Sequence, residues 1–341
     1  MKYSNNYILY PVNRALERAI TNSLGLLSEA AAEAAAPDTT VTVADNFLNT
    51  RGNYEQHRFR TSILQPLREA LEELVTDEYR EQDSLAWAEA QNNLGNILAA
   101  LGQQQSNAGM FEKAIQCFHH ALEEYSQEDA PMDWAATQSN LGTALQAFGR
   151  QESDSKALTK SVDAYTNALL VWTRKETPEE WALAMHQLGA TLHAHGRIMK
   201  GNRNLEKSVV AYKNALAVLD ADNHAFELVA THNNCGAVKQ NLAESEENPD
   251  RLQEAIHSYE TAITVCLEQQ LPVHLVALCK VNKSTARGML AELTEDRMLA
   301  DEVADEFEVI LEVFPHALQP LCAKHCVEQM SKFRKMAEAS S

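Results

Sequence analysis

Two clusters contain the residue types that a metal site or a nucleophilic site would need. Cys322 and Cys326 are spaced i, i+4 around His325, while His193 and Cys235 fall in neighbouring predicted helices. A structural zinc site needs four ligands, and neither cluster supplies a recognisable quartet. Free cysteine is commonly a small buried apolar residue, so we interpret both clusters as packing and predict no metal site.

Signatures of catalysis are absent from the sequence. It contains no GxSxG, P-loop, HExxH, paired CxxC or GxGxxG motif. The six cysteines are scattered, and their spacing suggests no disulfide framework. We therefore predict a protein that is not an enzyme and needs no cofactor.

The charge balance restricts the classes of partner. The 341 residues carry a net charge of −19, which disfavours non-specific binding to nucleic acid or to an anionic membrane surface. No apolar run reaches the ~18 residues that a spanning helix needs. The first residues do not resemble a secretory signal. We expect a cytoplasmic protein that binds no nucleic acid and does not insert into membranes.

The elements that position these residues recur at a fixed step. WAEAQNNLG, WAATQSNLG and WALAMHQLG begin at Trp87, Trp134 and Trp181, each 47 residues after the last. Two further copies begin at Leu228 and Leu275, and a second segment of each copy keeps the same step. Its five copies begin at Phe111, Leu158, Leu205, Leu252 and Leu299. Five copies in phase predict a stacked repeat protein.

Each copy has the pattern of two helices. Apolar and small residues recur every three to four positions in both segments, as the face of a packed helix requires. Prolines such as Pro131 and Pro178 suit a first helical turn. We expect the glycines after the first helix to form left-handed C-caps, namely Gly102, Gly149 and Gly196.

These residues resemble the tetratricopeptide repeat. That family pairs Leu-Gly in helix A with small-x3-aromatic-x2-Ala in helix B, as Leu94-Gly95 pairs here with Ala114, Phe118 and Ala121. The usual period is ~34 residues. The longer WAxxQxNLG form is similar to repeats of bacterial signalling proteins, including those attached to caspase-like proteases. The resemblance implies an all-α, right-handed α-solenoid of helix-turn-helix repeats with helical caps; armadillo and HEAT repeats are the alternative fold.

The repeats divide the chain into three parts. We predict an N-terminal helical cap with a degenerate leading repeat over 1–82, five repeats over 83–314, and a C-terminal capping helix and tail over 315–341. The first part contains an Ala-rich helix over Asn13–Ala36 and a helix B over Ser62–Tyr79. The terminal helix over 318–338 is expected to turn four residues inward, namely Leu321, Val327, Met330 and Phe333.

The fifth copy departs from the pattern. Asn282 and Lys283 stand where Leu and Gly are expected, and Glu306 replaces the aromatic residue of helix B. Close packing of the two helices is in doubt there, and this copy is a candidate transition to the cap.

The resemblance implies that helix A lines a concave groove. A carboxamide offers both a donor and an acceptor, so it can pair with one peptide unit whatever the side chain. Asparagine is disfavoured inside helices, so its recurrence on this face favours peptide binding over simple solvation. The candidate residues are Asn92, Asn93, Asn96, Ser139, Asn140, Thr143, Gln146, His186, Gln187, His193, Asn233, Asn234, Gln240, Lys280 and Arg287.

Three functions are consistent with this pattern. The first is an interaction scaffold that binds a peptide or partner segment in the groove, with Lys280 and Arg287 favouring a carboxylate-bearing end. The second is a regulatory or sensor subunit that controls a separate enzyme, such as a caspase-like protease. The third is a self-assembling structural protein. Each of the three functions is compatible with a homo-oligomer. The sequence identifies no partner.

Overall fold

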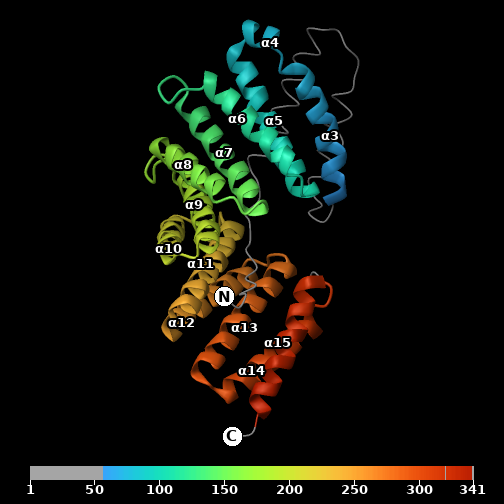
Figure 1. The fold of residues 1–341 in the computed structure, drawn as a ribbon, viewed down its shortest axis with the longest axis vertical. Coiled ribbons are helices and arrows are strands. Elements are labelled where there is room, and N and C mark those ends of the chain that lie inside the picture. The colour runs from blue at the N-terminus through green and yellow to red at the C-terminus, as the bar shows by residue number, and fades with distance from the viewer. Residues whose placement is uncertain (1–56, 319, 340–341) are drawn as a thin grey trace. The chain divides into compact units, whose positions relative to one another are not determined.

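The computed structural model describes residues 57–318 and 320–339, with side chains from Leu64 onward. It is 84 % helical, and the described residues form thirteen helices and no strand (Figure 1). Adjacent helices pack in succession as helix pairs, which confirms the predicted all-α repeat fold. The helix predicted over Asn13–Ala36 lies outside the described residues.

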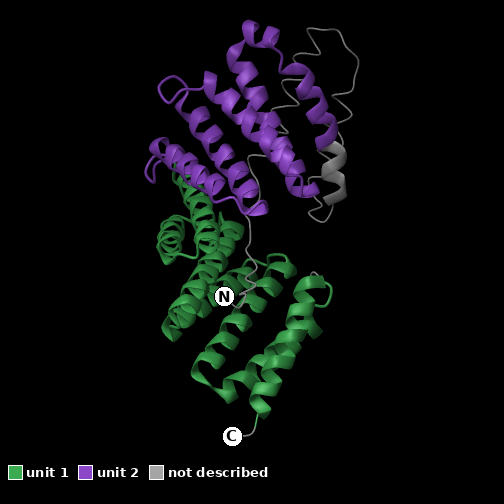
Figure 2. Ribbon diagram, viewed as in Figure 1, with its two compact units in different colours: residues 1–12, 177–341 green, residues 13–176 purple. Residues whose placement is uncertain are grey.

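The chain divides into two compact units at Glu176 and Thr177 (Figure 2). We call the described residues 57–176 the N-terminal unit. A leading helix and a short connecting helix precede its two helix pairs, α5 with α6 and α7 with α8. The helices are α3 (His57–Leu74), α4 (Asp77–Gln82), α5 (Ser84–Gln105), α6 (Ala108–Glu124), α7 (Pro131–Gln151) and α8 (Ser155–Val171).

The described residues from 177 onward form the C-terminal unit. It consists of three helix pairs and a last helix that has no following partner among the described residues. The helices are α9 (Pro178–Met199), α10 (Asn202–Leu216), α11 (Ala225–Glu246), α12 (Pro249–Glu268), α13 (Val273–Thr294), α14 (Arg297–Val313) and α15 (Pro320–Glu338).

A glycine of helix A contacts the aromatic ring of helix B in four of the five pairs. A Cβ atom at Gly95 would lie 2.7 Å from Phe118 of α6, and one at Gly189 would lie 2.9 Å from Tyr212 of α10. Gly142 and Gly236 meet Tyr165 and Tyr259 in the same way. The aromatic rings are fully buried, so Leu-Gly recurs because no larger residue fits under the ring.

The expected glycine C-caps are wrong. Helices α5, α7 and α9 continue past the three glycines, and no described glycine has a positive φ. The left-handed residues near these helix ends are instead Ser106 and Lys200, which end α5 and α9, and Ser153, two residues after the end of α7. The glycines serve close packing, since a Cβ at Gly149 would lie 2.8 Å from Leu158 Cγ of α8. The glycines concerned are Gly102, Gly149 and Gly196.

Helix α3 occupies the place of a leading helix B. Leu64, Leu67 and Leu71 are buried, and each precedes by 47 residues a buried residue of α6. The helix ends at Leu74, earlier than the predicted end at Tyr79. Thr76 then caps α4 by accepting a hydrogen bond from the Tyr79 amide, 3.2 Å.

The inward face of α15 differs from the predicted one. Leu321 is 80 % exposed and Val327 is 49 % exposed, whereas Cys322, Cys326 and Phe333 are buried. The Phe333 ring packs directly on Gly288 of α13, which fixes the rotation of α15 about its axis. The prediction is therefore wrong for Leu321 and Val327, and it is confirmed for Phe333 and for Met330, which is half-buried against the same core. The apolar residues of α15 do not form a single stripe, and the contact with Gly288 selects which of them face inward.

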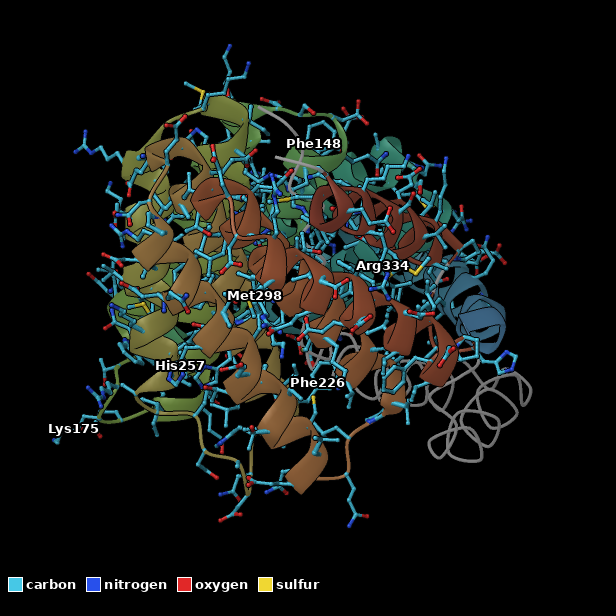
Figure 3. The ribbon with its side chains drawn as sticks, turned by 90° about the horizontal axis from the view of Figure 1, so that it is seen from below. Phe148, Lys175, Phe226, His257, Met298 and Arg334 are labelled. Atoms are coloured by element: carbon cyan, nitrogen blue, oxygen red, sulfur yellow. The ribbon has the colours of Figure 1, made fainter. Side chains whose placement is uncertain are left out.

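Electrostatic contacts hold α15 against the acidic helix α14. Arg334, labelled in Figure 3, donates to Asp301 at 2.7 Å and to Glu308 at 2.8 Å, and it also contacts Asp305. Lys332 reaches Glu292 of α13 at 2.6 Å. These contacts place the basic residues of α15 opposite the carboxylates of its neighbours.

The outward face of α15 carries charges at positions where α13 is buried. Helix α15 begins 47 residues after α13, so each of its positions has a counterpart in α13. Three residues that are buried in α13 have charged, exposed counterparts in α15, while Leu321 and Val327 keep part of its outer face apolar. The counterparts of Ala277, Val281 and Thr285 are Lys324, Glu328 and Lys332.

Candidate binding surface

In the N-terminal unit, two asparagines of neighbouring A helices form a half-buried pair. Asn140 of α7 donates through Nδ2 to Asn92 Oδ1 of α5, 3.0 Å. This bond uses the carbonyl of Asn92 and one amide hydrogen of Asn140. The amide group of Asn92 and the carbonyl of Asn140 stay available, so the pair presents a donor beside an acceptor.

Other residues of the row surround this pair. Asn93 is 2 % exposed, and its Nδ2 has no hydrogen-bond partner. Asn96 is buried and donates to the backbone carbonyl of Asn92, 3.1 Å, while half-buried Thr143 contacts the Tyr165 hydroxyl, 2.9 Å. Ser139 is half-buried and Gln146 is buried, which completes the predicted residues of this unit.

In the C-terminal unit, His186 of α9 is buried and bonded to α11. Its Nδ1 lies 2.7 Å from Thr231 Oγ1, and that hydroxyl donates to the Glu227 carbonyl, 2.6 Å. The Thr231 hydrogen is therefore in use, so His186 must donate from Nδ1. Burial lowers the pKa of His186 to about 3, so the ring is neutral at pH 7. Its Nε2 is then a buried acceptor without a hydrogen-bond partner.

The remaining buried members of the row link successive A helices. Asn241 of α11 contacts His193 Nε2 of α9, 2.6 Å, and Asn282 of α13 donates to Asn233 Oδ1 of α11, 2.8 Å. Asn233 in turn donates to Asn234, 3.2 Å. Buried carboxamides require such bonds, so these residues also stabilise the stacking of the repeats.

Gln240 makes two buried contacts within the same unit. Its Oε1 accepts from the Tyr259 hydroxyl, 3.0 Å, and its Nε2 lies 3.0 Å from Met289 Sδ. Gln240 therefore connects helix B of its own repeat with helix A of the next one.

The two cations of the row differ in their surroundings. Half-buried Arg287 of α13 pairs with Glu302, 2.5 Å, and with Glu306 of α14, so its charge is neutralised within the protein. Lys280 is half-buried, and no described carboxylate pairs with it. Gln187, also half-buried, is the remaining predicted residue. Of the two predicted cations, Lys280 is therefore the one whose charge no described carboxylate neutralises.

Sequence reasoning missed the partners that complete this polar network. Thr231, Asn241 and Asn282 follow members of the row by 45, 48 and 49 residues. Polar residues near the repeat period are the signal that could have found them. Asn282 had been noted only as a departure from Leu, and its bond to Asn233 explains the departure.

The two clusters that could have carried chemistry are packed into the core. Cys322 and Cys326 are buried, and hydrogen bonding to Cys322 together with burial raises the pKa of Cys326. His325 lies 3.3 Å from Thr285. Burial also raises the pKa of Cys235. Among the described residues, no group of three or more His, Cys, Asp or Glu side chains could hold a metal ion.

Comparison with known protein families gives a match for one helix pair of the chain. Residues 87–124 match the family model of the tetratricopeptide repeat, a span that runs from Trp87 in α5 to the end of α6. The comparison with curated proteins gives no match. Within the described residues, no helix is long and apolar enough to cross a membrane. The helix pair formed by α5 and α6 is therefore similar to a tetratricopeptide repeat, a family associated with protein–protein interaction.

Proposed function

We propose that the chain is a non-enzymatic interaction scaffold, which binds an extended peptide or partner segment along its A helices. The Asn92–Asn140 pair carries this proposal, because it is half-buried and presents one donor beside one acceptor. A peptide unit offers the complementary acceptor and donor.

The buried Nδ2 of Asn93 supports the same surface. Leaving a buried amide without a partner costs about 1–3 kcal/mol, and a bound carbonyl oxygen would remove that cost. The proposed contact region is the half-buried part of the row in the N-terminal unit, formed by Asn92, Ser139, Asn140 and Thr143.

The test compares two variants of the full chain. A partner captured by the wild-type protein is purified, and its affinity is measured by calorimetry. Asn92→Ala combined with Asn140→Ala removes the pair, and we expect affinity to fall roughly ten- to a hundredfold if two bonds are lost.

Asn167→Ala is the matched control, because Asn167 is a half-buried asparagine of α8 in the same unit. Its affinity for the partner should match that of the wild type. Equal affinity of the double variant and the wild type, with unchanged helix content, would overturn the proposed contact region.

A further inference from the structure

Helix α10 exposes a basic face. Arg203, Lys207 and Lys213 are exposed and recur at helical spacing, with Val210 between them at 58 % exposure. None of these three cations forms an ion pair with a described residue. An unpaired basic face is unexpected in a chain of net charge −19. We call these four residues the basic stripe.

Helix α12 exposes an acidic face at the same register. Asp250, Glu254 and Glu260 are exposed, and each follows a cation of the basic stripe by 47 residues. His257 follows Val210 by 47 residues, so it occupies the corresponding position of α12. Glu254 and Glu260 have only distant internal partners, at 3.6 and 3.9 Å, and their side chains stay 49 % and 53 % exposed. We call these four residues the acidic stripe.

The two stripes lie on neighbouring helices of one unit. Arg251 of α12 reaches Glu206 of α10 at 2.5 Å, and α11 packs against both helices, so α10 and α12 are the B helices of successive repeats and approach each other at this ion pair. The surface is therefore divided lengthwise into a basic half and an acidic half. Such a surface is complementary to itself when one copy is rotated by 180° about an axis that runs along the two helices.

We propose that this surface docks a second copy of the chain as a two-fold dimer. The rotation places α10 of each copy over α12 of the other, in parallel. Because the stripes share one register, Lys207 then faces Glu254 and Lys213 faces Glu260 of the second copy. The contacts occur twice, once on each side of the axis, and Val210 lies among them.

A second copy fits this surface better than another charged partner does. An anionic polymer would satisfy the basic stripe, but it would be repelled by the acidic stripe beside it and by the net charge. A basic peptide would leave the basic stripe unpaired. Only an occupant with both charges in the same register pairs both stripes, and this chain provides that register. The dimer uses the outer faces of B helices, so it is independent of the proposed peptide contacts on the A helices.

Sedimentation of the full chain tests the association. Exposed ion pairs are weak and are screened by salt. We expect a dimer at about 0.01 M ionic strength, where the Debye length is about 30 Å, and at least a tenfold higher dissociation constant at about 1 M, where it is about 3 Å. A monomer under both conditions would overturn the proposal.

Charge exchange tests the arrangement. Lys207→Glu with Lys213→Glu reverses the basic stripe, and Glu254→Lys with Glu260→Lys reverses the acidic stripe. Each variant alone brings like charges together and should be monomeric. An equimolar mixture restores opposite charges on both sides of the axis and should form a heterodimer. A dimer that survives either reversal, or two folded variants that do not combine, would refute the arrangement.

Two further variants separate docking from folding. Lys156→Glu with Lys160→Glu reverses exposed cations on α8, at the register of Arg203 and Lys207, and should leave the dimer intact. Circular dichroism checks each variant for helix content. If reversing the acidic stripe lowers the helix content, Asp250→Lys replaces that variant, because Asp250 has no described ion pair, and the mixture then uses Arg203→Glu as its complement, since Arg203 faces Asp250 in the shared register. Loss of the dimer in the α8 variant would mean that total charge, rather than the stripes, controls association.

Discussion

Gly236→Ala tests whether the contact between glycine and the aromatic ring determines the packing of each helix pair. The added Cβ would lie 2.8 Å from Tyr259 Cε1 and 3.0 Å from Cδ1 and Cζ. The ring is fully buried, and its hydroxyl donates to Gln240 at 3.0 Å. The ring therefore cannot move aside without breaking that bond or disturbing its other neighbours.

Two opposing effects set the size of the change. Alanine is better than glycine inside a helix by about 1 kcal/mol. Overpacking a well-packed core costs about 1–3 kcal/mol, and a ring held on all sides belongs in the upper half of that range. We expect a net loss of about 1–2 kcal/mol, which corresponds to a melting temperature lower by roughly 1–3 °C for a chain of this size.

Thermal melting followed by circular dichroism measures the effect against two controls. Gly109→Ala at the start of α6 meets only Asn107 Oδ1 at 3.4 Å, an ordinary contact, so it should stabilise the protein by about 0.4–1 kcal/mol. In a Tyr259→Leu background the ring is absent, so Gly236→Ala should cost less than in the wild type. Equal shifts for both glycine variants, or an unchanged cost in that background, would refute the reasoning.

Two more predictions concern the end of the chain and acid stability. Removing residues from 316 onward uncovers Gly288 and buried Phe307, so the shortened chain should melt at a lower temperature and scatter more light; a monodisperse chain with unchanged melting would refute the capping role of α15. The folded pKa of His186, about 3, lies below the usual ~6.5 of the unfolded state. The unfolded state therefore binds more protons between these values, and stability should fall as pH falls from about 6.5 toward 3. His186→Gln should flatten that dependence between about pH 6 and 4, and an identical slope in both proteins would contradict the assignment.

Local rules predicted the fold well, because each repeat presents the same packing problem. The pairing of Gly95 with Phe118 was visible in the sequence as two residue types at a fixed separation. The end of a helix depends on weaker preferences. Gly149 was therefore misread as a cap, although it lies inside α7 and accommodates Leu158. A glycine that permits close approach and one that ends a helix look identical in a single sequence.

The candidate site was predictable in composition but not in burial. The polar residues of the A helices recur near the repeat period, and Asn92 with Asn140 shows that the structure brings two of them together in the N-terminal unit. Whether an asparagine reaches a ligand or a neighbouring helix depends on distances that periodicity does not contain. Asn233, bonded to Asn282, is fully buried for this reason.

The departures in the fifth repeat compensate one another. In this repeat Lys283 replaces the glycine and Glu306 replaces the aromatic residue, so the close apolar contact is absent. An ion pair takes its place, with Lys283 Nζ 3.3 Å from a Glu306 carboxylate oxygen. Ser284 also donates to Glu306, 2.6 Å. Although burial opposes it, bonding to Ser284 and the charges of Lys283 and Arg287 lower the pKa of Glu306.

Removing either partner alone would leave a partly buried charge without its counterion, which costs more than the pair contributes. The substitutions at 283 and 306 are therefore best understood as one change. The aromatic packing that α14 lacks at this position is supplied instead by α15, whose Phe333 rests on Gly288 of α13. The fifth repeat, which has an ion pair at the position of the glycine and the ring, thus receives a glycine–aromatic contact from α15, at Gly288, five residues beyond Lys283.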